Sequence, residues 1–113
     1  MSATLFSQII DRSIPADIIY EDEYCLAFND IAPQAPLHCL LIPKKPIPKL
    51  ADTCAEDQAL LGHLLHTAPK IAAQQGHGEH FRVVINNGER AGQSVFHLHL
   101  HILGGRALMW PPG

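Results

Sequence analysis

The chain has 113 residues, which is the length of one domain with a single core. Hydrophobic residues make up 47% of the composition and charged residues only 17%, a balance that favours burial of some surface against a partner chain. The formal net charge is -3, and the eight basic residues are scattered apart from the pair Lys44–Lys45. The composition therefore favours a small ligand over a nucleic acid polymer.

Cysteine usage and the N-terminus indicate the compartment. The three cysteines, Cys25, Cys39 and Cys54, form no C-x-x-C pair. A disulfide framework is therefore not expected, and the sequence predicts a reducing compartment. The first ten residues lack the basic start and long apolar run of a signal peptide. No run approaches the roughly 20 apolar residues of a membrane helix. These features predict a soluble, cytoplasmic protein without a membrane segment.

The N-terminal third of the chain predicts a short helix and three strands. Thr4 can cap a helix whose apolar residues follow at helical spacing, and Pro15 ends it. Residues 18–20 and 25–28 are predicted as the two strands of a hairpin, joined by an acidic turn. The continuous apolar run at residues 38–42 is typical of a central strand that is covered on both faces.

A long helix is predicted in the middle of the chain. Thr53 and Glu56 have the spacing of a capping box, and leucines recur at helical spacing after them. Pro69 lies inside this pattern and is expected to kink or split the helix, because it removes one backbone hydrogen bond. Gly76 and Gly78 are plausible residues for the C-terminal cap.

The C-terminal part predicts two more strands, at residues 81–86 and 95–103, separated by a turn-rich loop. The tail, residues 104–113, is rich in Pro and Gly but also apolar. The order of helix, strands, helix and strands predicts an α+β domain with a largely antiparallel sheet.

Three alternating histidines, His97, His99 and His101, lie in the last predicted strand. Successive side chains of a strand point to opposite faces, so the three imidazoles are expected on one face. Such a polar cluster is costly to bury without partners, which favours a functional site over a purely structural role. The residues on the other face can pack on a core: Phe96, Leu98, Leu100 and Ile102.

Two kinds of chemistry are open to such a cluster. Alternate histidines can converge on zinc, but no acidic residue or cysteine nearby in the sequence supplies a further ligand. His63 and His66 could in principle join, although they fit a half-solvated helix face better. The alternative is phosphoryl chemistry, in which a neutral imidazole attacks phosphorus while the nearby Gly92 and Ser94 bind the anion.

The run His97-Leu-His99-Leu-His101 resembles the motif of the histidine triad (HIT) family. Separate blocks agree with that family: residues 30–38, the Ile-Pro-Lys-Lys at residues 42–45, Asn86, and the Gly-Gln-Ser at residues 92–94. The Gly-Gly-Arg after Leu103 and the final Trp-Pro-Pro-Gly are similar to the Hint branch. The resemblance covers nearly the whole chain and implies a single HIT domain over residues 1–113, with a five-stranded antiparallel sheet, one long helix and a short N-terminal helix.

The resemblance implies a purine nucleoside phosphoramidase that acts on a small nucleotide and needs no cofactor or metal. The resemblance implies that His99 is the nucleophile and forms a nucleotidyl-histidine intermediate. Water then releases the nucleoside monophosphate from His99. His97 is expected to orient His99 through its backbone carbonyl, and His101 to contact a phosphate oxygen.

A loop before the triad is implied to bind the phosphate. Ser94 and the backbone near Gly92 and Gln93 are expected to hold the anion and help protonate the leaving amine. His38 is expected beside Ser94 as part of the proton path, although a lone buried histidine is usually structural. Asn86 is implied to contact the phosphate or the ribose.

The nucleoside is implied to lie near Asp30, whose two acceptor oxygens suit the ribose hydroxyls. The position of Asp30 in a turn before two prolines predicts a turn-forming role equally well. On periodicity alone, Phe6 and Ile9 fit the core. Five apolar residues are implied to sandwich the base: Leu5, Phe6, Ile9, Phe28 and Ile31.

The resemblance further implies a two-fold homodimer whose sheet continues across both copies, with Trp110 reaching the partner's site; the alternative is a disordered terminus. Three other functions stay open: a dinucleoside polyphosphate hydrolase, a nucleotide-binding regulatory adaptor and a zinc protein. The leaving group, the choice of adenine or guanine, and the pathway are left open.

Overall fold

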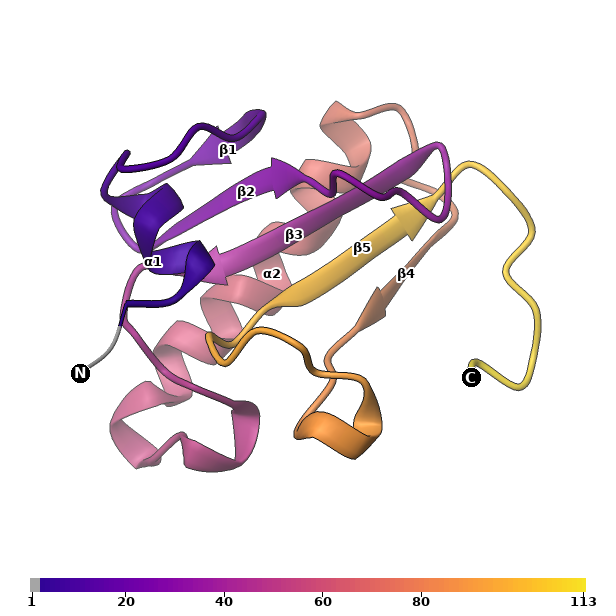
Figure 1. Ribbon diagram of the computed structural model, residues 1–113. Helices are drawn as coiled ribbons and strands as arrows, with labels where there is room; N and C mark the ends of the chain where they lie inside the picture. The colour runs from indigo at the N-terminus through magenta and orange to yellow at the C-terminus, as the bar shows by residue number, and fades with distance from the viewer. Residues whose placement is uncertain (1–2) are drawn as a thin grey trace.

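A five-stranded antiparallel sheet lies between two helices in the computed structural model, which describes residues 3–113 (Figure 1). The strand order is β1-β2-β3-β5-β4, so β1 and β4 form the edges. No helix within the described residues is long and apolar enough to span a membrane. The predicted α+β class, with one long and one short helix, is confirmed. The elements are α1 (Leu5–Ile10), β1 (Ile18–Glu21), β2 (Cys25–Asn29), β3 (Leu37–Pro43), α2 (Gln58–Gln74), β4 (Phe81–Val84) and β5 (Leu100–Gly104).

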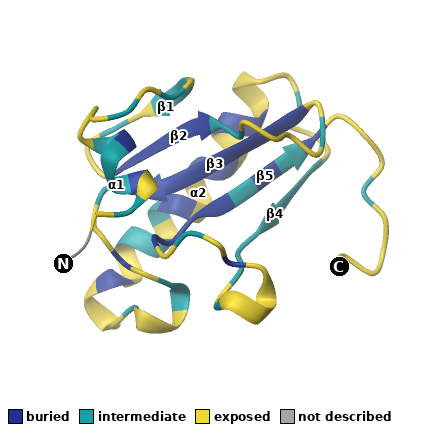
Figure 2. Ribbon diagram, viewed as in Figure 1, coloured by how far each residue is buried: buried dark blue, intermediate teal, exposed yellow. Residues whose placement is uncertain are grey.

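The central strand β3 is covered on both faces, as its continuous apolar run predicts. All seven of its residues are buried, and the strand is dark blue along its length in Figure 2. Leu41 belongs to the core cluster that contains residues of α2, whereas Leu40 and Ile42 belong to the cluster that contains Phe6 and Ile9 of α1. Side chains of β3 therefore alternate between two cores, and α1 and α2 cover opposite faces of the sheet.

The cap of α2 differs from the predicted one. The capping box belongs to the 3-10 turn Ala55–Asp57 that leads into α2, and it is formed by Cys54 and Asp57, not by Thr53 and Glu56. The carboxylate of Asp57 accepts the Cys54 N–H at 3.0 Å and also pairs with Lys45. A long-range ion pair thus selects the buried carboxylate as the cap, and the Thr53 hydroxyl bonds to a local carbonyl instead.

The helix α2 continues through Pro69, so the expected split is wrong. Leu64, Ala68 and Ile71 are fully buried against the sheet, and this packing offsets the backbone hydrogen bond that the proline removes. The helix ends at Gln74, close to the predicted Gly76, whose φ of +86° suits glycine. His77 N–H then bonds to the Ala72 carbonyl at 2.8 Å, which completes a Schellman motif.

The predicted strand over residues 95–103 is too long at its start, because β5 begins only at Leu100. The Leu98 N–H donates to the Ile47 carbonyl at 2.7 Å, so this segment bonds to the loop after β3 instead of continuing the ladder. Leu98 is still buried in the core with Leu100 and Ile102. Phe96 is 44% exposed, and its predicted place in the core is wrong.

Candidate active site

Four histidines gather where β3 and β5 lie side by side under α1. His38 belongs to β3 and His101 to β5, while His97 and His99 lie in the irregular segment that leads into β5. The ring centroids of His99 and His101 are 5.1 Å apart, and those of His38 and His101 are 5.2 Å apart. His38, His97 and His99 are buried, and His101 is half-buried. The structure therefore places His38 beside the triad, although it lies 59 residues before His97 in the sequence.

The hydrogen bond of His99 determines which ring nitrogen is free. Its Nδ1 lies 2.7 Å from the backbone carbonyl oxygen of His97, and a carbonyl only accepts, so Nδ1 carries the proton. Burial lowers the pKa of His99, and the bond to the carbonyl only partly opposes this. Near pH 7 the ring is therefore neutral, and Nε2 has the lone pair that a nucleophile needs.

His97 holds this segment in place. Its Nε2 donates to the carbonyl oxygen of Pro43, at the end of β3, at 2.7 Å. Burial lowers the pKa of His97 as well, so this ring is neutral too. Its side chain is used to fix the segment to β3, and its backbone carbonyl makes the expected contact with His99.

A chain of hydrogen bonds orients His101. The Gln34 N–H donates to Nδ1 of His38 at 3.0 Å, so that nitrogen carries no proton and the proton of His38 is on Nε2. Nε2 of His38 lies 3.0 Å from Nδ1 of His101 and donates to it. The pKa of His101 is lowered to about 4, first by burial. The neutral ring of His101 therefore carries its proton on Nε2 and can donate there.

Asp30 lies beside this chain and also forms a turn. One carboxylate oxygen accepts the Ala32 N–H at 2.8 Å, as the turn-forming interpretation predicts, and the other lies 3.5 Å from Nε2 of His38. Both ring nitrogens of His38 are thus accounted for by His101, Asp30 and Gln34. The hydrogen bonds of His38 go to Gln34 and His101 and not to Ser94, so the proton path from His38 to Ser94 stays a prediction.

The loop before the triad uses most of its polar groups internally. The Gly92 N–H donates to Glu89, and the Gln93 N–H donates to the Gly88 carbonyl at 3.1 Å. The side-chain amide of Gln93 is buried; its nitrogen donates to the Pro48 carbonyl at 2.8 Å. Gln93 therefore holds the loop together, and these N–H groups are not free for an anion.

In the expected phosphate loop Gln93 is buried, whereas Gly92 and Ser94 are exposed. Gly92, which precedes Ser94 by two positions, has a φ of +101°, and a Cβ there would lie 3.5 Å from Nδ2 of Asn86. The Asn86 amide and the Gly92 backbone are thus neighbours, as the nucleotide-binding hypothesis for both requires. The left-handed conformation is the reason that glycine is needed at this position.

The five apolar residues expected around the base fall into two groups. Phe6, Ile9 and Phe28 are buried in one core cluster, and the Phe6 ring lies 5.0 Å from the His99 ring, edge to face. The other two are on the surface: Leu5 is 52% exposed and Ile31 is 99% exposed. The core interpretation of Phe6 and Ile9 is therefore confirmed, and only Leu5 and Ile31 present large free surfaces.

Within residues 3–113, two sets of side chains have donor atoms close enough to share a metal ion. In the first, ligand atoms of Asp30, His38 and His101 lie within 4.8 Å of one another, so an acidic residue does lie near the triad although none is near in sequence. The second set is Asp22, Cys25 and His63. Nε2 of His63 lies 2.8 Å from the Asp22 carboxylate, so His63 binds the β1–β2 turn and does not join the triad.

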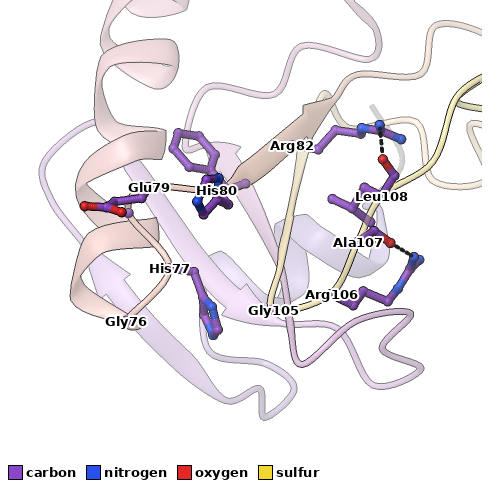
Figure 3. Close-up of a pocket in the computed structure, with 11 residues that line it drawn as sticks. Gly76, His77, Glu79, His80, Arg82, Gly105, Arg106, Ala107 and Leu108 are labelled. Carbon is purple, nitrogen blue, oxygen red and sulfur yellow. Dashed lines mark hydrogen bonds between the residues drawn. The ribbon is translucent and has the colours of Figure 1, made fainter.

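A hollow of about 960 Å³ on the described surface contains none of the triad. Figure 3 shows it between the segment that starts at Gly76 and the tail from Gly105 to Leu108, with Arg82 and Arg106 bonded to tail carbonyls. A hollow of about 280 Å³ adjoins Asp30 and His38, and one of about 450 Å³ adjoins His97. The two smaller hollows therefore adjoin the histidine cluster, and the hollow of about 960 Å³ does not.

Comparisons with known proteins identify the family of the chain. The HIT domain family matches residues 11–108. An uncharacterized HIT-like protein of Synechocystis is 64% identical over 110 residues, which cover 97% of this chain and 96% of that protein. The Adenylylsulfatase HINT1 of Arabidopsis thaliana is 47% identical, with coverage of 99% and 78%.

Solved structures share the fold. The crystal structure of a HIT family hydrolase from Legionella pneumophila superposes with a TM-score of 0.95 and 46% identity, over 98% of this chain and 100% of that one. A histidine triad protein from Clostridium difficile superposes with a TM-score of 0.90 at 39% identity, over 96% and 97%. The chain therefore belongs to the histidine triad family of nucleotide hydrolases and transferases.

Proposed function

We propose that this protein hydrolyses the P–N bond of a purine nucleoside 5′-phosphoramidate, giving the nucleoside monophosphate and an amine. The observation that carries the proposal is the state of His99. Its Nδ1–H is bound by the His97 carbonyl and its pKa is lowered by burial, so Nε2 is an uncharged nucleophile at neutral pH.

In the first step Nε2 of His99 attacks the α-phosphorus, an Nε2–P bond forms and the P–N bond of the substrate breaks. The ring gains positive charge in this step, and the carbonyl dipole of His97, 2.7 Å from Nδ1, stabilises that charge. The amine leaves with a proton, which we assign to the exposed hydroxyl of Ser94 as donor. Water then attacks phosphorus, the Nε2–P bond breaks, and a proton from that water restores Ser94.

His101 is proposed to bind a non-bridging oxygen of the phosphate. Its Nδ1 accepts from His38, so its remaining proton on Nε2 is available as a donor. The low pKa of about 4 keeps the ring neutral at physiological pH, which leaves one defined N–H for this contact. A donor that is aimed in advance costs no reorganisation when charge builds up on the phosphate.

The nucleoside is proposed to lie next to Asp30. Its oxygen near His38 has no short hydrogen bond, so it can accept from a ribose hydroxyl. Leu5 and Ile31 are proposed to supply exposed apolar surface for the base, and Phe6 packs on the His99 ring. Asn86 is proposed to contact the phosphate or ribose from beside Gly92.

A second candidate substrate is adenylyl sulfate, because the Arabidopsis relative at 47% identity is named for that activity. The same attack of His99 on the α-phosphorus would release sulfate. Sulfate leaves as a stable anion and needs no proton, whereas an amine does. The two activities therefore differ in their demand on the proposed acid, Ser94.

The test compares kcat/KM for adenosine 5′-phosphoramidate, adenylyl sulfate and a diadenosine polyphosphate. We expect the phosphoramidate to be the best substrate. We also expect Ser94→Ala to lower its turnover by about 10- to 100-fold and to affect adenylyl sulfate less. A preference for the diadenosine compound would overturn the proposal, and nucleotide binding without turnover of any of the three would indicate the regulatory adaptor.

We propose further that two copies of the chain pair through β4. This strand is at the edge of the sheet, all four of its residues are only half-buried, and it contains Phe81, Val83 and Val84. An unpaired apolar edge readily accepts a second strand. The tail beside it carries Trp110, 80% exposed, which we propose reaches the partner's site.

Light scattering coupled to size exclusion tests this pairing. We expect a mass of twice the 12.4 kDa of the chain. Val84→Lys is expected to give the single-chain mass, because a lysine on an edge strand opposes pairing, whereas Ala51→Lys on an exposed turn should remain dimeric. A single-chain mass for the unmodified protein would contradict the proposal.

A further inference from the structure

Arg106 follows β5 and reaches back to the loop that precedes β3. Its Nε donates to the carbonyl oxygen of Gln34 at 2.8 Å. Its Nη1 donates to the Ala107 carbonyl at 2.9 Å, a bond that is visible in Figure 3 and that holds the guanidinium in this orientation. The two segments that Arg106 joins are 72 residues apart in the sequence.

The backbone at Gly105 brings the tail against the same loop. Gly105 has a φ of +95°, and a Cβ there would lie 2.7 Å from Cβ of Pro36. The close approach and the backbone conformation both require glycine. Arg106 is therefore directed at Gln34 by packing on both sides, through Gly105 and through its own bond to Ala107.

Gln34 in turn controls the proton of His38. The Gln34 N–H donates to Nδ1 of His38 at 3.0 Å, and this bond requires that Nδ1 has no proton. Without it, the His38 ring could hold its proton on Nδ1 instead. Nε2 of His38 would then accept from Nδ1 of His101, and the neutral ring of His101 would have no proton left on Nε2 to donate.

We propose that Arg106 is a positioning residue that, through Gln34, selects the tautomer of His38 in which His101 presents an Nε2–H. This inference rests on the proposed function, in which that N–H binds the phosphate. The Asp30 carboxylate, 3.5 Å from Nε2 of His38, also favours the same tautomer. Loss of Arg106 is therefore expected to give a mixture of tautomers and not a complete change.

The expected phenotype of Arg106→Ala is kinetic. Arg106 is exposed, so removing its hydrogen bond should leave the unfolding midpoint unchanged. We expect kcat for adenosine 5′-phosphoramidate to fall by about 3- to 10-fold, with KM little changed. A change of about 3- to 10-fold corresponds to the free energy of one hydrogen bond. Arg106→Lys keeps one donor and should restore most of kcat. Arg90→Ala, which removes another exposed guanidinium, is the matched control.

The tautomers themselves are measured by two-bond ¹H–¹⁵N correlation on protein labelled with ¹⁵N-histidine, without substrate. The unmodified protein and Arg90→Ala should show His38 and His101 with protons on Nε2 only, and Arg106→Ala should show both forms. Unmixed tautomers in Arg106→Ala, or mixed tautomers with unchanged kcat, would overturn the inference. If the unmodified protein fails to hydrolyse the phosphoramidate, the proposed function fails, and the tautomer measurement still decides whether Arg106 positions His38.

Discussion

Replacing His99 with alanine is expected to lower kcat for adenosine 5′-phosphoramidate by about 10³-fold or more, because removal of a nucleophile typically costs several orders of magnitude. The other two rings of the triad are each fixed by a hydrogen bond to β3. Nε2 of His97 is bound to the Pro43 carbonyl, and Nδ1 of His101 accepts from His38. Nε2 of His99 has a free lone pair, and the proton on the opposite nitrogen is held by the His97 carbonyl.

Binding and folding should survive this change. The His99 side chain makes one hydrogen bond, to the carbonyl of His97, and the ribose and base are proposed to contact other residues. We expect the affinity for adenosine monophosphate, measured by calorimetry, to change by less than about tenfold, the effect of one hydrogen bond. His66→Ala, an exposed histidine of α2, is the control and should keep full activity. Retention of most of the activity by His99→Ala would disprove the covalent route.

Replacing Asp22 with alanine is expected to lower the free energy of unfolding by about 2–4 kcal/mol, because several hydrogen bonds to one partly buried carboxylate are lost together. The carboxylate accepts the N–H groups of Tyr24 and Cys25 at 2.8 and 2.9 Å, which closes the turn between β1 and β2. It also accepts from the Tyr20 hydroxyl and from Nε2 of His63 on α2. Asp22 therefore ties the edge hairpin to the long helix.

The effect of Asp22→Ala should depend on pH. Burial by itself raises the pKa of Asp22, but the donated hydrogen bonds outweigh it and hold the pKa well below its ordinary value of 3.8. A carboxylate with a depressed pKa in the folded state contributes stability above its unfolded pKa and loses it as the pH falls. The difference between the two proteins should be full at pH 6 and should shrink below about pH 4.

Urea denaturation at several pH values measures this difference. Asp52→Ala is the control, because Asp52 is exposed and its carboxylate makes no hydrogen bond within residues 3–113. That variant should match the unmodified protein at every pH. A destabilisation by Asp22→Ala that stayed constant down to pH 2 would show that packing, and not the charged carboxylate, is what Asp22 contributes.

The local sequence pattern was sufficient for the elements and for the choice of the triad. Thr4 caps α1 as its position predicts, Gly76 ends α2, and the apolar run from His38 to Ile42 is a buried central strand. These features depend on a residue's own backbone preference or on neighbours a few positions away. The histidine motif and its flanking blocks identified the family for the same reason, since they lie in the chain itself.

Where sequence reasoning failed, a long-range contact had overridden a local one. Asp57, in place of Glu56, completes the capping box of the turn before α2 because Lys45 pairs with it. Pro69 stays inside the helix because that helix is buried on the sheet. Residues 95–99 alternate like a strand but bond to the loop after β3. The spacing of hydrophobic residues along the chain does not predict these outcomes. Each depends on which distant segment packs against the residue in the folded protein.

Sequence by itself thus determined the family, the fold class and His99 as the candidate nucleophile. Only the tertiary structure decided the protonation of the site. His38 and His101 are 63 residues apart, and the position of the proton between them depends on the backbone N–H of Gln34. A backbone N–H is present at nearly every residue, so the sequence does not mark its role. A tautomer is selected by the partners of both ring nitrogens, and those partners come from different strands and loops that meet only when the sheet has formed.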